Sequence, residues 1–300
     1  MTEEITTYKC DTQTNCDHLR GKHLDDSHYD VVVGGDEPVD VFKPDGQPLV
    51  KYRPGWFSED LCRSVTPACR KAAADTTNRG TAAGELLTVD GKSANYRATK
   101  MDGTATKTAH SAPVKSGIVG YFDRTPRIPY CRQTNFLVSQ AASWNKFLPY
   151  IQRADQGLKE LLPERWAAQR EYATNTASDW VIPDSTFTTV TVNRNFRTAT
   201  HKDAGDLKAG FGVMSCIRNE KYSGAYLVFP EFRVAVDFSS GCLCLADVHH
   251  WHTNTQFTDI RTGYERISLV FYYREKMINC KSAKKEVEWA KSRKAGDSLR

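Results

Sequence analysis

Alternating apolar and polar positions predict a strand-rich region over residues 181–275. The segment FTTVTVNRNF (187–196) places Val190 and Val192 among polar and β-branched residues, a pattern typical of a β-strand. The segment RISLVFYYR (266–274) has the same character, and Gly and Pro residues punctuate the chain between the two. We therefore expect the core sheets of the protein in this region.

The first half of the chain carries signals for a hairpin and for helices. Pro44-Asp45-Gly46 predicts the turn of a hairpin, and Pro54-Gly55 predicts a second turn. Ser58, with acidic residues directly after it, is typical of a helix N-cap. Apolar residues recur at helical spacing over 136–173, so we expect helices beside the sheets.

Composition divides the chain into three parts. Residues 1–40 are polar and predict a loosely ordered N-terminal arm, whereas 41–277 form the folded domain and 278–300 form a basic C-terminal tail. Within the domain, 72–116 consists mainly of Ala, Thr, Gly, Ser and Lys. Because few large apolar residues are available to anchor that segment, we expect a long flexible insertion.

The cysteines indicate a reducing compartment. The first residues, MTEEITTYKCDTQ, lack the basic and apolar segments of a secretion signal, and no apolar run is long enough to span a membrane. Nine scattered cysteines without such a signal predict reduced thiols and an intracellular protein. A zinc site in the arm is the weaker alternative, because the spacing of its potential ligands matches no compact zinc pattern: Cys10, Cys16, His18, His23 and His28.

The net charge of +5 is concentrated at the C-terminal end. Residues 276–300 contain eight Lys or Arg and three Asp or Glu, so they account for the whole surplus. Mixed charges on helix-forming residues favour a solvated terminal helix. The alternative is an electrostatic handle for nucleic acid, to which the basic 72–116 insertion could also contribute.

A His-x-Asp pair follows the predicted strand 187–196. On an extended chain, residues i and i+2 point to the same face, so His201 and Asp203 can reach one point in space. An imidazole and a carboxylate are two of the three ligands of a 2-His-1-carboxylate iron site. Taken alone, the pair is more often a solvated surface feature.

The sequence HHWH (249–252) offers the third ligand. Strand alternation places His250 and His252 on one face and His249 on the other. We assign His252 as the ligand and expect His249 to be a buried, hydrogen-bonded side chain. Fourteen residues after His252, Arg266 opens the next predicted strand.

This order of residues predicts an α+β fold whose core is a double-stranded β-helix (jelly-roll) with flanking helices. The open end of such a barrel collects ligands from several strand ends, and a facial triad leaves positions on Fe(II) for a 2-oxo acid and O2. Arg266 could bind the distal carboxylate of 2-oxoglutarate in bidentate fashion, and Ser268 could add a hydroxyl. The alternative for Arg266 is an ion pair with a structural acid such as Asp247.

Three segments resemble the TET/JBP family of DNA-base dioxygenases: NRNFRTATHKDAGD, GAYLVFPEFRVAVDFSSGCLCLADVHHWHTNT and RISLVFYYREKM. The resemblance covers about residues 117–277. It implies Fe(II), 2-oxoglutarate and O2 as cofactor and co-substrates. It also implies that the iron ligands are His201, Asp203 and His252, and that the 2-oxoglutarate anchor is Arg266 with Ser268.

The resemblance also implies where a flipped base would lie. Asp206 matches a position at which members carry a base-contacting Asp or Asn. Arg274 is a departure, because TET-like members have a base-contacting histidine there. The cysteine-rich region of TET proteins is absent, and the compact length is similar to phage, protist or fungal members.

From these residues we expect hydroxylation of the 5-methyl group of 5-methylcytosine in double-stranded DNA to 5-hydroxymethylcytosine, by a monomer. The Asp206 carboxylate can accept a hydrogen bond from the N4 amine of cytosine. Arg274 leaves thymine as an alternative, since its donors suit carbonyl groups. Further alternatives are an oxygenase acting on a protein or small molecule and a silent base-binding module. Three aromatic residues are candidates for stacking on the base, although a core role is more common: Tyr121, Phe122 and Trp251.

Overall fold

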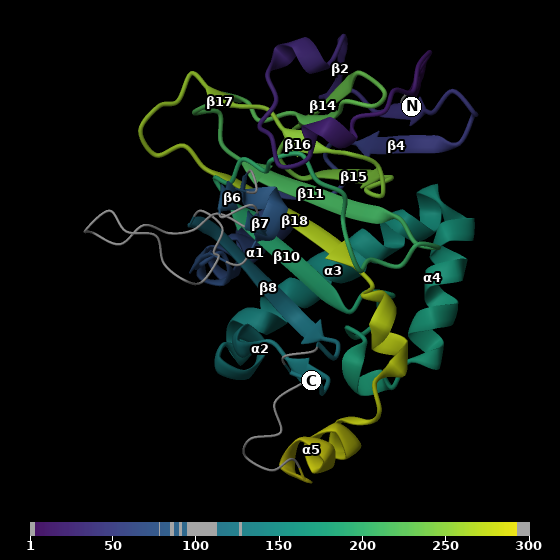
Figure 1. Cartoon of the computed structure of the whole chain (residues 1–300), viewed down its shortest axis with the longest axis vertical. Helices are drawn as coiled ribbons and strands as arrows, with labels where there is room; N and C mark the ends of the chain where they lie inside the picture. The colour runs from purple at the N-terminus through teal and green to yellow at the C-terminus, as the bar shows by residue number, and fades with distance from the viewer. Residues whose placement is uncertain are drawn as a thin grey trace.

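The computed structural model describes residues 4–77, 79–84, 87–89, 92–94, 113–125 and 128–292. Within them, two β-sheets face each other and helices cover the outer face of the larger sheet (Figure 1). None of the helices in these ranges combines the length and the apolar character that a membrane crossing requires.

The larger sheet carries most of the strands. Its order is β1 (Thr6–Lys9), β3 (Val39–Phe42), β4 (Pro48–Arg53), β15 (Cys242–Ala246), β11 (Gly212–Arg218), β18 (Arg266–Tyr272), β10 (Thr189–Arg194), β8 (Val114–Phe122) and β5 (Asp75–Thr76), with β9 (Arg132–Gln133) paired to β8. The central strand β18 runs antiparallel to both neighbours.

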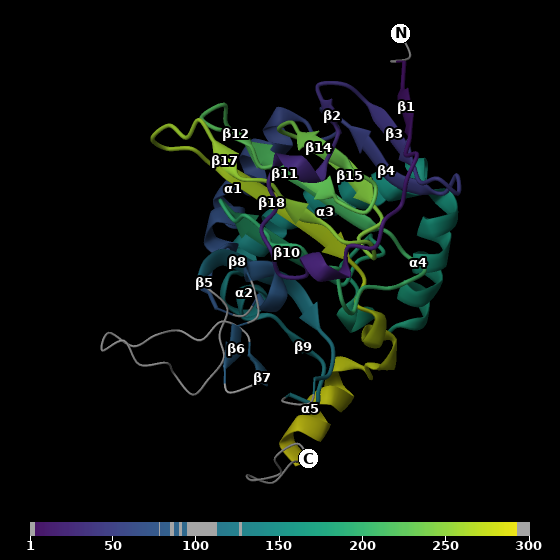
Figure 2. The same cartoon turned by 45° about the horizontal axis from the view of Figure 1, so that its top comes forward.

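The smaller sheet lies opposite the larger one (Figure 2). Its order is β16 (Thr253–Asn254), β13 (Leu227–Phe229), β14 (Val234–Phe238) and β2 (Val31–Gly35). Short pairs complete the strands: β12 (Ser223–Gly224) with β17 (Phe257–Thr258), and β6 (Leu87–Val89) with β7 (Lys92–Ala94).

Two apolar cores hold these layers together. Alternate residues of β18 divide between them: Ile267, Leu269 and Phe271 pack under the helices, whereas their neighbours face the space between the sheets. A second cluster joins the two sheets through residues such as Met214 of β11 and Phe229 of β13. Both faces of β18 are thus covered, and none of its residues is exposed.

The helices are α1 (Glu59–Ala72), α2 (Asn135–Ser139), α3 (Ala141–Leu161), α4 (Pro163–Asn175) and α5 (Ala283–Ser292). Short 3-10 turns are η1 (Asp17–Leu19), η2 (Asp26–His28), η3 (Gly80–Ala83), η4 (Ser178–Trp180) and η5 (Glu275–Asn279). The long helix α3 packs against α1 and the larger sheet, through buried residues such as Phe147, Ile151 and Leu158. The predicted jelly-roll core with flanking helices is confirmed.

Several local predictions are confirmed. The hairpin turn joins β3 to β4, with Gly46 at φ +83°, a conformation that glycine adopts without strain. Ser58 caps α1 by accepting a hydrogen bond from the backbone N–H of Leu61. The helical spacing over 136–173 corresponds to α2, α3 and α4.

The N-terminal segment differs from the loosely ordered arm predicted for residues 1–40. Its strand β1 pairs in parallel with β3, and β2 pairs in parallel with β14 of the smaller sheet. The segment is held because Cys10, Cys16 and Leu24 are buried in apolar clusters. The cysteines therefore pack as apolar groups, and the alternative of a zinc site has no support among the described residues.

The insertion predicted for 72–116 is shorter than expected. Residues 75–76 already pair with residues 114–115 at the edge of the larger sheet, and residues 79–84 lie against the core. The remainder of that prediction, residues 95–112, lies outside the described residues. The pairing was missed because β5 is only two residues long and carries no alternating pattern.

The prediction of reduced thiols is wrong for one pair. Cys131 and Cys280 form a disulfide that joins the β9 region to the segment before α5, and the other seven cysteines are free and buried. Sequence spacing could not reveal the disulfide, because the two cysteines are 149 residues apart and meet only in the fold.

In the predicted tail, α5 is a helix whose Glu286 is buried and ion-paired with Arg124. Residues 293–300 lie outside the described part of the chain.

Candidate active site

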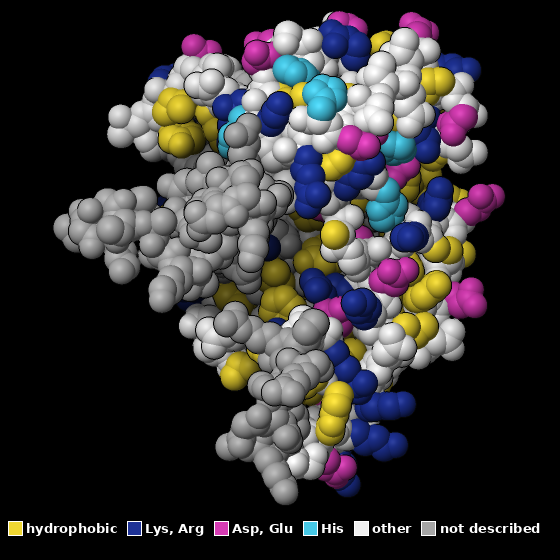
Figure 3. Space-filling model, in the orientation of Figure 1, with side chains coloured by type: hydrophobic (Ala, Val, Ile, Leu, Met, Phe, Trp, Pro, Cys, Tyr) yellow, Lys and Arg dark blue, Asp and Glu magenta, His cyan; other side chains and the backbone are white. Residues whose placement is uncertain are grey.

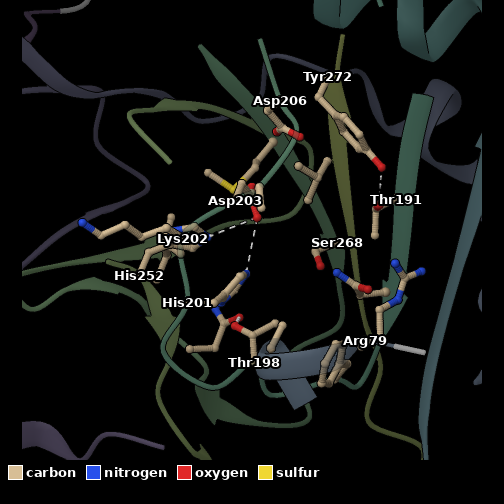
Figure 4. Close-up of a pocket in the computed structure, with 18 of the residues that line it drawn as sticks. Arg79, Thr191, Thr198, His201, Lys202, Asp203, Asp206, His252, Ser268 and Tyr272 are labelled. Atoms are coloured by element: carbon tan, nitrogen blue, oxygen red, sulfur yellow. Dashed lines mark hydrogen bonds and ion pairs between the residues drawn. The ribbon is translucent and has the colours of Figure 1, made fainter. Parts of the chain in front are cut away.

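His201, Asp203 and His252 converge in the space between the two sheets (Figure 4). Nε2 of His201 lies 3.5 Å from Oδ1 of Asp203, and Nε2 of His252 lies 3.9 Å from the same oxygen. The three potential ligand atoms lie within 4.8 Å of one another, and no other such group of His, Cys, Asp or Glu occurs in the described residues. The arrangement matches a 2-His-1-carboxylate triad in composition and spacing.

Backbone hydrogen bonds set this geometry. The N–H of His201 donates to the carbonyl of His252 at 3.0 Å, and the N–H of His252 donates back at 2.9 Å. The N–H of Asp203 donates to the carbonyl of Val248 at 3.1 Å. These contacts join the two ligand-bearing segments, which are about fifty residues apart in sequence.

The Nδ1 atoms of both histidines are engaged behind the site. Nδ1 of His201 lies 2.7 Å from the carbonyl oxygen of Ala199, and Nδ1 of His252 lies 3.0 Å from that of His250. Because a carbonyl accepts only, each Nδ1 carries a proton, and Nε2 is the nitrogen of each ring left to face the cavity. Such backbone contacts fix the tautomer and the ring orientation of a metal-binding histidine.

Burial and mutual charges set the protonation of the triad. Burial, and after it the charge of His201, lowers the pKa of His252 to about 4. Burial disfavours the ionised form of Asp203, but the hydrogen bond from His201 and the charges of both histidines outweigh it, so the pKa of Asp203 is lowered. At neutral pH, His252 is thus neutral and Asp203 is a carboxylate, the states in which these groups bind a metal.

The triad faces a cavity of about 380 Å³. Ser268 and Thr191 lie across it from His201 in Figure 4. Its walls come from both sheets and from the η3 segment: Arg79, Thr81, Ala82, Ile118, Thr191, Asn193, Phe196, Thr198, His201, Lys202, Asp203, Ala204, Asp206, Met214, Leu227, Phe238, His252, Asn254, Arg266, Ser268, Val270, Tyr272 and Arg274. All seven site residues predicted from the sequence therefore line one cavity.

Arg266 fits the predicted role of a 2-oxo acid anchor. Its side chain is 5% exposed and lines the cavity at the start of β18, with Ser268 next along the same strand face. No carboxylate in the described residues forms an ion pair with it, whereas Asp247 pairs with Lys43 at 3.2 Å. A buried guanidinium with no carboxylate within ion-pair distance is suited to an anionic ligand.

Asp206 and Arg274 lie at another part of the cavity wall. Their backbones form an isolated β-bridge, and Nε of Arg274 donates to Oδ1 of Asp123 at 2.7 Å. Burial, and after it the charge of Asp203, raises the pKa of Asp206 well above its usual range. The Asp206 carboxyl is therefore easier to protonate in this pocket than in water.

The prediction for the neighbouring histidines is wrong in two respects. Residues 247–250 form a turn rather than a strand, so alternation does not apply and His250 leaves the face of His252. Nδ1 of His250 lies 2.6 Å from Oε2 of Glu231. His249, expected to be buried, is half-buried and lines a second cavity with His250.

The aromatic residues suggested for stacking do not line the cavity. Tyr121 packs edge-on against Trp180, and Phe122 lies beneath the guanidinium of Arg274. Trp251 donates through Nε1 to Asp17 at 2.8 Å, outside the cavity. The aromatic walls are instead Phe196, Phe238 and Tyr272.

Sequence reasoning also missed polar residues of the cavity. Thr191 and Asn193 face it from β10, and Tyr272 faces it from the end of β18. Thr191 and Asn193 are two residues apart in a strand whose intervening valines are buried, and this spacing could have identified them as cavity residues. Arg79 carried no such signal, because η3 reaches the cavity only through the tertiary fold.

Comparison with known proteins identifies the family. The family model Tet_JBP, the oxygenase domain of the 2OGFeDO superfamily, matches residues 117–275. The chain belongs to this family. Oxygenases of this superfamily use Fe(II), 2-oxoglutarate and O2, and the His-Asp-His group of this chain, together with the unpaired Arg266, fits that set.

Curated relatives named as thymine dioxygenases match about half of the chain. Thymine dioxygenase JBP1 of Trypanosoma brucei brucei is 36% identical over 169 residues, which are 53% of this chain and 19% of that protein. Thymine dioxygenase JBP1 of Leishmania braziliensis is 35% identical over 164 residues, which are 53% of this chain and 20% of that protein. The match thus spans about a fifth of each relative.

One solved structure shares the fold along most of the chain. NgTET1 in complex with 5mC DNA superposes with a TM-score of 0.56 at 14% sequence identity, covering 97% of this chain and 91% of that one. At this identity the likeness supports the architecture and says nothing of the substrate.

Proposed function

We propose that the protein is an Fe(II)- and 2-oxoglutarate-dependent dioxygenase that hydroxylates the 5-methyl group of a pyrimidine in DNA, with thymine as the favoured base. The observation that carries the proposal is the triad His201, Asp203 and His252 facing one cavity with the unpaired guanidinium of Arg266. The relatives that are 35–36% identical to about half of this chain are thymine dioxygenases.

In this proposal the triad holds the iron and Arg266 binds the distal carboxylate of 2-oxoglutarate, assisted by the hydroxyl of Ser268. When bound, iron with 2-oxoglutarate and O2 supplies the oxidant that converts a methyl C–H to C–OH, while 2-oxoglutarate is released as succinate and CO2. The chain itself orients these groups and surrounds the reacting methyl with the cavity walls.

The polar walls suit the edge of thymine. Its O4 is an acceptor, and a neutral carboxyl can donate to an acceptor. The raised pKa of Asp206 favours that neutral form. Nε of Arg274 is occupied by Asp123, but Arg274 lines the cavity, and carbonyl oxygens are suitable partners for the donors of a guanidinium.

The second candidate is 5-methylcytosine, the base expected from the sequence. An ionised Asp206 would accept from the N4 amine of cytosine and repel O4 of thymine. The protonation of Asp206 in the loaded enzyme therefore separates the two bases. The expectation of 5-methylcytosine stays a prediction.

DNA would approach the face shown in Figure 3, where Lys and Arg side chains border a hollow near the centre. A stacked base cannot reach the triad, so the nucleotide must flip out at a cost of a few kcal/mol. Lys202 lines the triad cavity and also a neighbouring one with Arg165 and Lys208. These cations are placed to contact phosphates beside the flipped nucleotide.

The test is incubation with Fe(II), 2-oxoglutarate and O2 on two duplexes that are matched except at one position, which is thymine or 5-methylcytosine. Nucleoside mass spectrometry should detect 5-hydroxymethyluracil from the first duplex in excess over 5-hydroxymethylcytosine from the second. Product from the 5-methylcytosine duplex alone would favour 5-methylcytosine, the second candidate, as the substrate base. Succinate formation without either product would redirect the search to a protein or small-molecule substrate, and the absence of succinate would indicate a silent module.

A further inference from the structure

Glu231 is a buried carboxylate outside the triad cavity. It lies in the turn between β13 and β14, and it is 6% exposed. It lines the neighbouring cavity rather than the one that holds the triad. Burial of a carboxylate is costly unless donors compensate it, so its partners indicate what it does.

Its partners come from both segments that carry the triad. Oε2 of Glu231 lies 2.6 Å from Nδ1 of His250 and accepts from the backbone N–H of Trp251 at 3.3 Å. Oε1 lies 3.8 Å from Nζ of Lys202. Lys202 stands between His201 and Asp203, and Trp251 directly precedes His252.

One of these contacts leads directly to a ligand. The carbonyl oxygen of His250 is the group that lies 3.0 Å from Nδ1 of His252. By holding the side chain of His250 and the next backbone N–H, Glu231 fixes the peptide that carries this carbonyl. Glu231 thus sets the orientation of the His252 ring indirectly, through His250 and Trp251.

The carboxylate is itself held in place. The backbone N–H of Thr14 donates to the carbonyl of Glu231 at 2.9 Å, which ties the turn to the N-terminal segment. On the far side of His250, Nε2 lies 3.6 Å from Oδ2 of Asp247. His250 therefore lies between two carboxylates, and Glu231 has little room to move to another partner.

We infer that Glu231 is a positioning residue for the iron site: it holds the 201–203 and 250–252 segments at the spacing that lets the triad share one metal ion. The inference rests on the iron site of the proposed function and is independent of the base. Removing a group that orients a metal ligand typically weakens metal binding by about 10- to 100-fold.

The experiment measures Fe(II) affinity anaerobically by titration calorimetry, together with the visible charge-transfer absorption of the Fe(II)–2-oxoglutarate complex. Glu231→Ala should weaken Fe(II) binding by about 10- to 100-fold. Glu231→Gln should fall between it and the wild type, because an amide oxygen still accepts from Trp251 but no longer carries a charge facing Lys202. A merely structural role would lower thermal stability without moving the Fe(II) affinity of the folded protein.

Glu286→Gln is the matched control. Glu286 lies on α5, is 2% exposed and forms an ion pair with Arg124. It should keep the Fe(II) affinity of the wild type. The inference is overturned if every Glu231 variant that folds binds Fe(II) within about twofold of the wild type. It is also overturned if neither variant folds, because Glu231 would then be a determinant of folding. Failure of the wild type to bind Fe(II) would instead refute the proposed iron site.

Discussion

The Nε of Arg274 donates to Oδ1 of Asp123 at 2.7 Å, so this arginine forms its ion pair with Asp123 rather than with Asp206, its backbone neighbour across the β-bridge. Arg274 therefore forms no salt bridge with the Asp206 carboxyl. Asp123 is only 6% exposed, and the pair therefore lies where solvent screens it little.

Asp123→Ala should lower kcat/KM for DNA by about tenfold, because an unpaired Arg274 can turn to Asp206 and remove both groups from the base. A tenfold loss corresponds to about 1.4 kcal/mol. Steady-state kinetics on the preferred duplex provide the measurement, with 2-oxoglutarate affinity as the control that should not change. An unaltered kcat/KM would show that the orientation of Arg274 does not matter for the base.

His201→Ala, Asp203→Ala and His252→Ala should each abolish hydroxylated product and strongly weaken Fe(II) binding while the circular dichroism spectrum stays that of the wild type. Each substitution removes one of three ligand atoms that lie within 4.8 Å of one another. His249→Ala is the matched control, since His249 is half-buried and lies outside the triad cavity. Equal loss in the control would argue against the assignment of His252.

Arg266→Lys should raise the apparent KM for 2-oxoglutarate by about tenfold or more, because a point charge replaces a planar fork that can bind a carboxylate in bidentate fashion. The measurement is a 2-oxoglutarate titration of succinate release at saturating Fe(II). A superimposable titration would mean that another cation of the cavity, such as Arg79, anchors the co-substrate.

Asp206→Asn should stabilise the metal-free protein at neutral pH. The pKa of Asp206 is raised in the fold, so its ionisation favours the unfolded state once the pH exceeds the usual carboxyl pKa of about 4. The stability gap between variant and wild type should therefore close as the pH falls towards 4 and widen as the pH rises. Thermal melts across this range test it, with Asp60→Asn as control because the Asp60 side chain is 90% exposed.

Cys280→Ser should lower the stability of the protein by about 2–5 kcal/mol, as is typical when a disulfide that closes a long loop is removed. Reductant should lower the melting temperature of the wild type towards that of the variant and leave the variant unchanged. Thiol titration of the denatured, unreduced wild type should find seven free cysteines. A count of nine would show that the disulfide does not form.

Local patterns were enough to predict much of this protein. Alternation and β-branched residues identified β10 and β18, because a strand buried on one or both faces restricts which residues each position accepts. The i, i+2 spacing of His201 and Asp203, followed by His252 and Arg266, predicted cavity residues correctly, because His201 and His252 meet in an isolated β-bridge and Arg266 begins β18. Local backbone structure depends mainly on a few neighbouring residues, so the sequence alone can predict it.

Contacts between distant segments could not be predicted in this way. Glu231 meets His250 and Lys202, Arg274 meets Asp123, and Cys131 meets Cys280 only after the sheets have closed, and no spacing along the chain records those meetings. The same holds for β2: its three valines are typical of a strand, but nothing along the chain records that this strand pairs with β14 of the smaller sheet. Backbone pairing and long-range ion pairs depend on where two surfaces come together, which is a property of the packed fold.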